Sequence, residues 1–544
     1  MNANEICKQN NENEHIQYTP AVLAANSVDS IRFNLTNDWN ILSSIYDLLV
    51  DEKAFCVASQ EWSEKIVLFE QPKELEFCFS FMHVLFFLPK KLIDLTIDEN
   101  KSLTMPEIEK ICRQVIKYSV KTSHGRFHNQ LFGQMDPYGL AGTWISEALN
   151  TSAYTYEVAP IFSLIETEII KRICELCGYV NGDGIFSPGG SISNMYGLAL
   201  ARYKRFPNIK TAGMFGLPPL VLFTSEESHY SLKKAAHWLG FGMDNCVEVT
   251  TNERGQMSVE DLEDKILQVK AEGRVPLFVN ATAGTTVLGA FDDFEKVADI
   301  CEKYDLWLHV DGCLGGSALF CYKYRQLLKG LHRSNSFSWN PHKSMGAPLQ
   351  CSLFITRELE LLPKCNSLAV DYLFQQDKFY DVSYDTGNKS VQCGRKVDAF
   401  KLWLMLKARG YGSYGRLLDH ALDISKVFVD KLRQRESRGF RLVIDEFQYT
   451  NICFWYIPEH LRNLEETEEW KQKLYEVAPK VKELMIREGT LMLGYCPLQY
   501  RNIGNFFRMV FTCFPVITDS ELDFILNEIE RLAEQLHKVI NGFV

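Results

Sequence analysis

Residues 336–343 read Ser-Phe-Ser-Trp-Asn-Pro-His-Lys, and a mainly apolar run from Leu349 to Ile355 follows a few positions later. Most lysines lie on the solvated surface, so a lysine alone supports no functional interpretation. A lysine in an apolar setting is different, because desolvation favours its neutral amine, which can form an imine. The position of Lys343 between Pro-His and a buried run therefore makes it a candidate nucleophile.

Short, nearly continuous apolar runs occur on both sides of this segment. They are Leu220–Phe223, Leu277–Asn280, Leu306–Val310 and Leu353–Ile355. Such runs are typical of strands that are buried on both faces of a parallel sheet. Polar or glycine-containing stretches follow the first three runs, beginning at Thr224, Ala281 and Asp311. Because binding sites in open α/β sheets lie at the carboxyl ends of strands, we expect functional residues at these positions.

The composition limits the classes of function. The chain has 544 residues, of which 46% are hydrophobic and 23% charged, as is ordinary for a globular protein. Its formal net charge is −11 and it has no basic patch, which argues against nucleic acid as a partner. No window approaches the roughly 18 continuous apolar residues of a membrane span, so no membrane partner is expected.

The 16 cysteines follow no disulfide framework, and the Asn- and Glu-rich N-terminus lacks the apolar core of a signal peptide. We therefore expect reduced thiols and a cytoplasmic location. The Cys-x-x-Cys pair formed by Cys174 and Cys177 ends an apolar helix pattern, which favours core packing over metal binding. No metal site is predicted.

Composition and periodicity suggest four parts. Residues 1–30 are polar and predict a disordered tail, and residues 31–110 predict an N-terminal helical segment. Residues 111–410 carry the strand patterns of a large α/β domain. A glycine-containing stretch at residues 408–412 marks the predicted boundary to a small α+β domain, residues 411–544, whose last helix begins with a capping box.

Several motifs occur in a fixed order along the chain. Residues 187–194 read Ser-Pro-Gly-Gly-Ser-Ile-Ser-Asn, residues 224–231 read Thr-Ser-Glu-Glu-Ser-His-Tyr-Ser, and residues 309–316 read His-Val-Asp-Gly-Cys-Leu-Gly-Gly. Together with residues 336–343, they make the chain resemble the group II pyridoxal-phosphate decarboxylases, in the branch of glutamate, cysteine sulfinate and aspartate decarboxylases. The resemblance implies a fold-type I (aspartate aminotransferase-like) α/β architecture with a mostly parallel sheet, pyridoxal 5'-phosphate as cofactor, and a homodimer with its active site at the interface.

The resemblance also implies the cofactor contacts. Lys343 matches the Schiff-base lysine, and Asp311 matches the aspartate that keeps the pyridine nitrogen protonated, so that the ring can accept electrons. His229 matches the histidine that stacks on the ring. The other implied positions are Thr282 near the phenolic oxygen, Cys313 on the ring face opposite His229, Ser191 and Ser193 at the phosphate, and Ser336 and His342 nearby.

Substrate contacts follow from the same resemblance. Arg508 matches the arginine that grips the α-carboxylate, for which a planar guanidinium is suited. Tyr380 matches a tyrosine that reprotonates Cα, in a polar stretch, Tyr380–Lys389, typical of a mobile lid. The remaining implied pocket residues are Gln130, Ser152, Tyr154 and His128. For His128, a positive charge near the substrate and a packed neutral ring are both open.

The substrate is predicted from two departures within the branch. Ser152 and Tyr154 resemble the cysteine sulfinate and aspartate enzymes, whereas Gly-Cys-Leu at residues 312–314 resembles the insect-type aspartate 1-decarboxylases. We therefore predict α-decarboxylation of L-aspartate to β-alanine and CO₂. Cysteine sulfinate, giving hypotaurine, is the alternative, and glutamate is third. Oxidative deamination and a non-enzymatic scaffold are the alternatives from other classes.

Overall fold

The computed structural model describes residues 93–368, 370, 372–375 and 377–540. The chain divides into two units, of which the first contains residues 93–117 and with them most of helix α4 (Met105–Tyr118). The second unit contains all described residues from Tyr118 onward. The predicted tail, and residues 31–92 of the predicted helical segment, lie outside the described residues.

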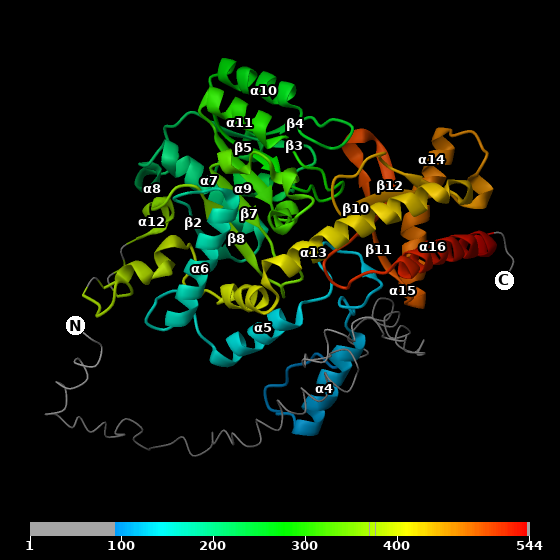
Figure 1. Cartoon of the computed structure of the whole chain (residues 1–544), viewed down its shortest axis with the longest axis horizontal. Helices are drawn as coiled ribbons and strands as arrows, with labels where there is room; N and C mark the ends of the chain where they lie inside the picture. The colour runs from blue at the N-terminus through cyan, green and yellow to red at the C-terminus, as the bar shows by residue number, and fades with distance from the viewer. Residues whose placement is uncertain (1–92, 369, 371, 376, 541–544) are drawn as a thin grey trace. The chain divides into compact units, whose positions relative to one another are not determined.

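A seven-stranded sheet forms the centre of the second unit (Figure 1). Its strands are β2 (Asp183–Ser187), β3 (Leu220–Ser225), β4 (Cys246–Val249), β5 (Val275–Thr282), β6 (Trp307–Gly312), β7 (Ser336–Trp339) and β8 (Ser352–Thr356). They lie in the order β2-β8-β7-β6-β5-β3-β4, and only β8 runs antiparallel to its neighbours. The four apolar runs fall in β3, β5, β6 and β8, so the mostly parallel α/β sheet is confirmed.

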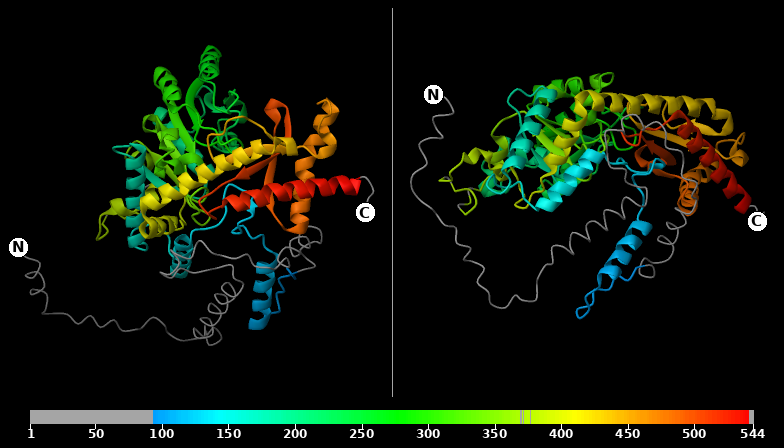
Figure 2. Two further views of the ribbon diagram at one scale, coloured as in Figure 1. Left: turned by 45° about the vertical axis from the view of Figure 1, so that its right-hand side comes forward. Right: turned by 60° about the horizontal axis from the view of Figure 1, so that its bottom comes forward.

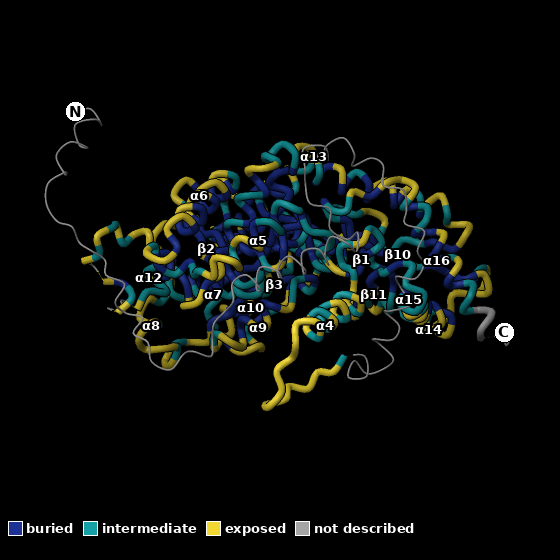
Figure 3. The backbone as a smooth tube through the Cα atoms, turned by 90° about the horizontal axis from the view of Figure 1, so that it is seen from below, coloured by how far each residue is buried: buried dark blue, intermediate teal, exposed yellow. Residues whose placement is uncertain are grey.

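Helices cover both faces of this sheet. One face packs against α7, α9 and α12, and the other against α6, α10, α11 and the first part of α13. The bounds of the helices up to α12 are α5 (Pro137–Leu149), α6 (Pro160–Cys177), α7 (Gly190–Arg205), α8 (Ile209–Ala212), α9 (Ser231–Trp238), α10 (Val259–Ala271), α11 (Phe294–Tyr304) and α12 (Leu361–Asn366). Because both faces are covered, the strands have no solvated side, which explains their continuous apolar sequences. In Figure 3 the buried stretches, in dark blue, lie in the interior around the labels of the sheet, and the exposed stretches, in yellow, lie toward the outside.

The C-terminal region builds a second sheet of five strands in the order β1-β11-β12-β10-β9. The strands are β1 (Phe127–His128), β9 (Phe440–Leu442), β10 (Asn451–Tyr456), β11 (Met492–Leu498) and β12 (Ile503–Val510). It packs on the second part of α13, α15 (Val477–Glu488) and α16 (Asp519–Ile540), while α14 (Glu468–Tyr475) precedes α15. Strand β1 comes from the range predicted for the large domain, yet it pairs with β11.

Helix α13 (Asp398–Gln434) connects the two sheets, and Figure 2 shows this from two further sides. Gly410 interrupts it with non-helical angles, φ 72° and ψ 162°. The predicted domain boundary near residue 410 therefore falls at a kink inside one long helix. Leu402, before the kink, packs in the core of the first sheet, whereas Phe428, after it, packs in the core of the second.

Short 3₁₀ helices complete the second unit. They are η4 (Met243–Asn245), η5 (Gly315–Phe320), η6 (Arg325–Leu328), η7 (Leu331–Arg333), η8 (Val382–Tyr384), η9 (Thr386–Lys389), η10 (Glu436–Arg438), η11 (Glu459–Leu461) and η12 (Gln499–Arg501). The predicted capping box of the last helix is present, since the Thr518 N–H donates to the Glu521 carboxylate at 2.7 Å. Among the described helices, none combines the length and apolar character needed to span a bilayer.

Candidate active site

The predicted residues Thr282, Asp311 and Lys343 meet at the carboxyl edge of the parallel strands. Thr282 ends β5, Asp311 lies one residue before the end of β6, and Lys343 lies in the turn after β7. The strand register places Thr282 beside Asp311 and Asp311 beside Ser338. Parallel strands ending at one edge thus bring together residues that are up to 61 positions apart in the sequence.

Asp311 is buried and hydrogen-bonded at both carboxylate oxygens. Its Oδ2 accepts a bond from Asn194 Nδ2 at 2.8 Å, and its Oδ1 accepts one from the Cys313 N–H at 3.0 Å. Burial opposes ionisation, but the charges of His229 and Lys343 outweigh it, so the pKa of Asp311 is lowered. Asp311 is therefore a carboxylate, as a partner for a protonated ring nitrogen must be.

His229 lies between β3 and α9, two residues before the first residue of the helix, with its Nδ1 accepting a bond from the Ser231 N–H at 3.3 Å. Burial lowers the pKa of its imidazole, and the Asp311 carboxylate opposes this shift. The half-buried Lys343 exerts its charge on His229, Asp311 and Cys313. These four residues therefore form one electrostatically coupled group.

The turn before α7 forms a cradle for an anion. Gly189 has φ +98°, a conformation that favours glycine, and α7 starts at Gly190. A Cβ on Gly190 would lie 2.3 Å from Cys313 Sγ and 2.8 Å from Asn340 Nδ2, so only glycine fits there. The first backbone N–H groups of a helix have no partner within the helix and attract anions. The half-buried Ser191 lies in this first turn.

These residues fit pyridoxal phosphate. The start of α7 suits its phosphate, the Asp311 carboxylate suits its protonated ring nitrogen, the His229 ring suits its aromatic face, and Lys343 supplies the amine. Asn340 Oδ1 in addition is a buried oxygen without a hydrogen-bond partner among the described residues, leaving one acceptor free beside Gly190. The thiol of Cys313 is buried, which raises its pKa well above the ordinary value and keeps it neutral.

Three predicted cofactor contacts already have partners inside the protein. Ser193 Oγ lies 2.6 Å from Ser187 Oγ, and His342 Nδ1 lies 3.1 Å from the backbone nitrogen of Cys351. Ser336 is placed differently from our prediction. It pairs with His309, one side-chain layer below Asp311, and its hydroxyl lies between Trp307 and His309. We therefore do not retain Ser336 as a phosphate ligand.

Arg508 on β12 brings the second sheet to the edge of the first. Its Nη1 donates to the carbonyl of Thr286, in the loop after β5, at 3.0 Å, and its Nη2 donates to the carbonyl of Asn129 at 3.4 Å. Its Nε is buried and has no partner among the described residues. Gln130 follows Asn129 and is exposed. Arg508 thus keeps hydrogen-bonding capacity for a substrate carboxylate.

For His128, the structure supports the packed neutral ring and not the positive charge near the substrate. Its ring nitrogens face the carbonyl oxygens of Val510, at 3.2 Å, and Gly125, at 3.1 Å. The side chain is buried, and this burial lowers its pKa. A neutral ring inside the fold adds no positive charge to a substrate pocket, so the hypothesis of a charged His128 is not supported.

The predicted lid and pocket residues form a second group around Asp385. The Tyr380 hydroxyl donates to Asp385 Oδ1 at 3.1 Å, and its ring centre lies 5.1 Å from that of Tyr156. The Ser152 hydroxyl accepts a bond from the Arg395 N–H at 3.1 Å, and the Tyr154 carbonyl accepts one from the Gly387 N–H at 2.8 Å. Among the described contacts, none joins this group to Lys343 or Asp311.

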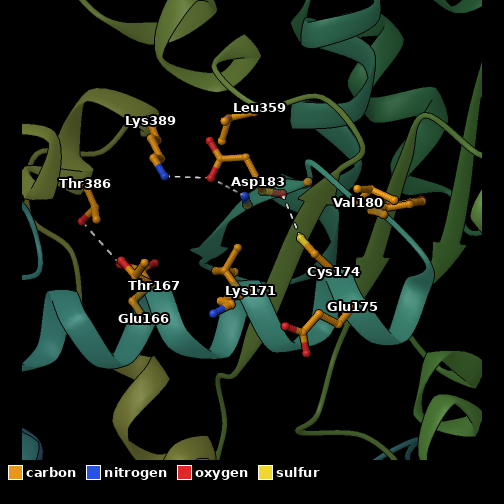
Figure 4. A pocket seen from close by; sticks show the side chains of 14 residues that line it. Glu166, Thr167, Lys171, Cys174, Glu175, Val180, Asp183, Leu359, Thr386 and Lys389 are labelled. Atoms are coloured by element: carbon orange, nitrogen blue, oxygen red, sulfur yellow. Dashed lines mark hydrogen bonds and ion pairs between the residues drawn. The ribbon is translucent and has the colours of Figure 1, made fainter.

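A pocket of about 250 Å³ lies between α6, β2 and η9 (Figure 4). Charged side chains of α6, β2 and η9 line it, including Glu166, Asp183 and Lys389, and the last two form an ion pair at 2.7 Å. Neither Lys343 nor Asp311 belongs to its lining. Across the described residues, no group of His, Cys, Asp or Glu side chains has the arrangement of a metal site.

Two residues beneath the site were quoted in the motifs but received no role from the sequence. Asn194 and His309 are fully buried and connect Asp311 to Ser336. The i, i+2 spacing of His309 and Asp311 in one strand indicates a shared face. No sequence pattern indicated that Asn194, from a helix over 110 positions earlier, lies between them.

Comparisons with known proteins identify the family. Residues 89–457 match the model of the pyridoxal-dependent decarboxylase conserved domain. Cysteine sulfinic acid decarboxylase of Mus musculus is 46% identical over 497 residues, which cover 91% of this chain and 96% of the relative. Acidic amino acid decarboxylase GADL1 of Xenopus tropicalis is 47% identical over 496 residues, which cover 91% of this chain and 93% of the relative.

A solved structure agrees with this assignment. The crystal structure of the mouse cysteine sulfinic acid decarboxylase in its apo form has a TM-score of 0.82 and 45% identity, with 92% of this chain and all of that chain covered. Its similarity extends over both sheets described above. The chain belongs to the pyridoxal-dependent decarboxylases and is an amino acid decarboxylase that uses pyridoxal phosphate.

Proposed function

We propose that this enzyme removes the α-carboxylate of a small acidic amino acid, with cysteine sulfinate as the first candidate substrate. The relatives that match more than nine-tenths of the chain are named for cysteine sulfinic acid or acidic amino acids. They support our alternative over L-aspartate, which the residues at 312–314 had favoured. The observation that carries the decarboxylase site is the coupled group of Asp311, His229 and Lys343 at one sheet edge.

Each residue has a separate task in this proposal. Bound pyridoxal phosphate supplies the electron sink for bond cleavage at Cα. Lys343 would supply the amine that holds the cofactor and would assist release of the amine product, while Asp311 would keep a proton on the ring nitrogen. Arg508 binds the substrate α-carboxylate, because its free Nε and planar guanidinium suit a carboxylate. Tyr380 Oη then delivers a proton to Cα.

Aspartate is the second candidate, and Cys313 is the observation that favours it. In aspartate and in cysteine sulfinate the second acidic group is attached directly to Cβ, whereas in glutamate it is one carbon farther away. One methylene changes binding by only ~1–3 kcal/mol in an ordinary pocket. Cys313 Sγ lies against Gly190 at the start of α7, and we infer that its bulk favours aspartate, like cysteine sulfinate, over the longer glutamate.

We also propose a homodimer in which a second copy completes each site. Within one chain, Tyr380 bonds to Asp385 and its ring packs at a tilt against that of Tyr156, with no described contact to Lys343. A proton donor for Cα must reach the reacting carbon. A second copy that contributes its lid would satisfy this need, and sedimentation together with activity measured across protein concentrations tests it.

The deciding experiment compares kcat/KM for cysteine sulfinate, aspartate and glutamate, with the amine products identified. A preference for cysteine sulfinate with hypotaurine formed supports the first candidate, and β-alanine from aspartate supports the second. Lys343→Ala is expected to abolish turnover of all three. Full activity in that variant contradicts the mechanism, and aldehyde products indicate oxidative deamination instead.

A further inference from the structure

A continuous line of buried hydrogen bonds leads from the core of the seven-stranded sheet to Asp311. Trp307 Nε1 donates to Ser336 Oγ at 2.8 Å, and Ser336 Oγ lies 2.8 Å from His309 Nδ1. His309 Nε2 lies 3.1 Å from Asn194 Oδ1, and Asn194 Nδ2 donates to Asp311 Oδ2 at 2.8 Å. All five side chains are at most 6% exposed, so water does not compete for these bonds.

The chemistry of the two ends determines the direction of every bond. The indole N–H of Trp307 only donates, and an ionised carboxylate at Asp311 only accepts. The Asp311 end fixes the tautomer. Asn194 turns its Nδ2 to Asp311 and therefore presents its Oδ1 to His309, so His309 carries its proton on Nε2. The bare Nδ1 of His309 then accepts the proton of Ser336, which itself accepts from Trp307.

The opposite direction requires a different state of Asp311. If His309 carried its proton on Nδ1, the Ser338 hydroxyl could donate to the bare Nε2, but Asn194 Oδ1 would then face a second acceptor at 3.1 Å unless the amide flipped. The flipped amide would place its oxygen against Asp311 Oδ2. Both atoms are acceptors, so they could share a hydrogen bond only if Asp311 were protonated. A doubly protonated His309 is disfavoured, because burial lowers its pKa to about 4.

We propose that this one-directional chain positions the Asp311 carboxylate and keeps it ionised toward the cofactor ring. The positioning residues are Trp307, Ser336, His309 and Asn194. The inference rests on the proposed contact between Asp311 and the ring nitrogen. Hydrogen bonds in a chain of uniform direction polarise one another, and each added donor favours the charged end in a buried setting. Ser336 thus acts on the cofactor from a distance, through His309.

Other charges at the site must be considered in a test that uses pH. His229, Lys343 and the Cys313 thiol face Asp311, while Asp311 is the charged group that faces His309. Substitution of Ser336 changes none of these charges. Ser338 provides a matched control, since it lies on the same face of β7 with its hydroxyl 3.2 Å from His309 Nε2. The line of hydrogen bonds from Trp307 to Asp311 needs no proton from Ser338.

The experiment compares Ser336→Ala, Ser336→Thr and Ser338→Ala in the full-length protein. In the cofactor-free protein, ¹⁵N shifts of histidine-labelled samples report the tautomer of His309, identified by its loss in His309→Gln. With cofactor bound, titration of the visible absorbance band reports proton affinity at the ring. We expect an Nε2–H tautomer, and for Ser336→Ala about a tenfold change in that proton affinity. Ser336→Thr restores it, and Ser338→Ala leaves it unchanged.

Two outcomes overturn the inference. One is an Nδ1–H tautomer of His309 in the unsubstituted protein, and the other is an equal response of Ser336→Ala and Ser338→Ala. Because the tautomer is measured without cofactor or substrate, it stands apart from the proposed function. If Asp311→Asn leaves the absorbance titration unchanged while His309 is Nε2–H, then the proposed role of Asp311 at the ring fails. The direction of the hydrogen bonds that lead to Asp311 is still supported in that case.

Discussion

The guanidinium of Arg508, on the five-stranded sheet, donates a hydrogen bond to the carbonyl of Thr286, in the loop after β5 of the seven-stranded sheet. The bond fixes the arginine at the seam between the two sheets. The proposed site is therefore built from both, since Asp311 and Lys343 come from the first sheet and Arg508, proposed to bind the carboxylate, comes from the second.

Arg508→Lys is expected to lower kcat/KM roughly 30- to 150-fold, corresponding to about 2–3 kcal/mol for a lost charged hydrogen-bond pair. A lysine keeps the charge but cannot bind a carboxylate through two parallel bonds. Steady-state kinetics with cysteine sulfinate and aspartate measure the effect. The control is Arg501→Lys, whose side chain bonds to Asn252 and Glu253 outside the site. Equal losses in both variants would contradict the assignment.

Replacing Arg395 by Met is expected to destabilise the fold by about 3–5 kcal/mol, because it leaves the Glu166 carboxylate buried without its ion-pair partner. The pair joins the segment after the lid to α6, and its side chains are only 2% and 4% exposed. Urea unfolding monitored by tryptophan fluorescence measures the loss. The adjacent Lys396→Met is the control, since its exposed pair with Glu147 is worth no more than ~1 kcal/mol.

Glu227→Gln is expected to stabilise the protein in a pH-dependent manner. Burial raises the pKa of the Glu227 carboxyl to about 7, above the ordinary value of 4.5. The folded state therefore binds this proton more tightly than the unfolded state. Ionisation begins to cost stability as the pH rises above 4.5, and the cost is complete above about 7. The gain from Gln is absent at low pH and reaches up to ~3 kcal/mol above neutrality.

Thermal unfolding of the Glu227 variant at several pH values tests this prediction. Glu226→Gln serves as the neighbouring comparison, because the Glu226 carboxylate accepts bonds from the backbone and hydroxyl of Thr251. That change is expected to destabilise the protein, because an amide replaces the carboxylate that accepts both bonds from Thr251. A Glu227 effect that is constant from acid to neutral pH would show that the buried proton is not the cause.

Gly190→Ala is expected to weaken cofactor binding, because the new Cβ would lie 2.3 Å from Cys313 Sγ. Overpacking of this kind costs about 1–3 kcal/mol. Equilibrium binding of pyridoxal phosphate to the cofactor-free protein measures it. In the double variant with Cys313→Ala, part of the loss is expected to return, since the contact with Asn340 remains. Strict additivity of the two changes would show that this contact is not the cause.

The sequence predicted the parts of the site that depend on local pattern. Continuous apolar runs located four strands, and the polar stretches behind them placed Thr282 and Asp311 at strand ends, whereas the role of Lys343 came from the resemblance to the decarboxylase family. Non-local pairing was beyond such patterns. The resemblance placed Ser336 near the phosphate, and the sequence alone does not give the register that places it beside His309. The pairing of β1 with β11, over 360 positions away, was likewise not predictable. The cytoplasmic location stays a prediction.

Helix α13 also constrains how the length of this chain can vary. Leu402 and Phe428 lie on one helix but serve different cores, on either side of the kink at Gly410. Each residue inserted into an α-helix rotates everything beyond it by about 100°. One extra residue in α13 would turn Phe428 away from its core while leaving Leu402 in place. The helix thus fixes the rotation, about its own axis, of the residues that pack on one sheet relative to those that pack on the other. Insertions are expected to be tolerated in surface loops but not within α13.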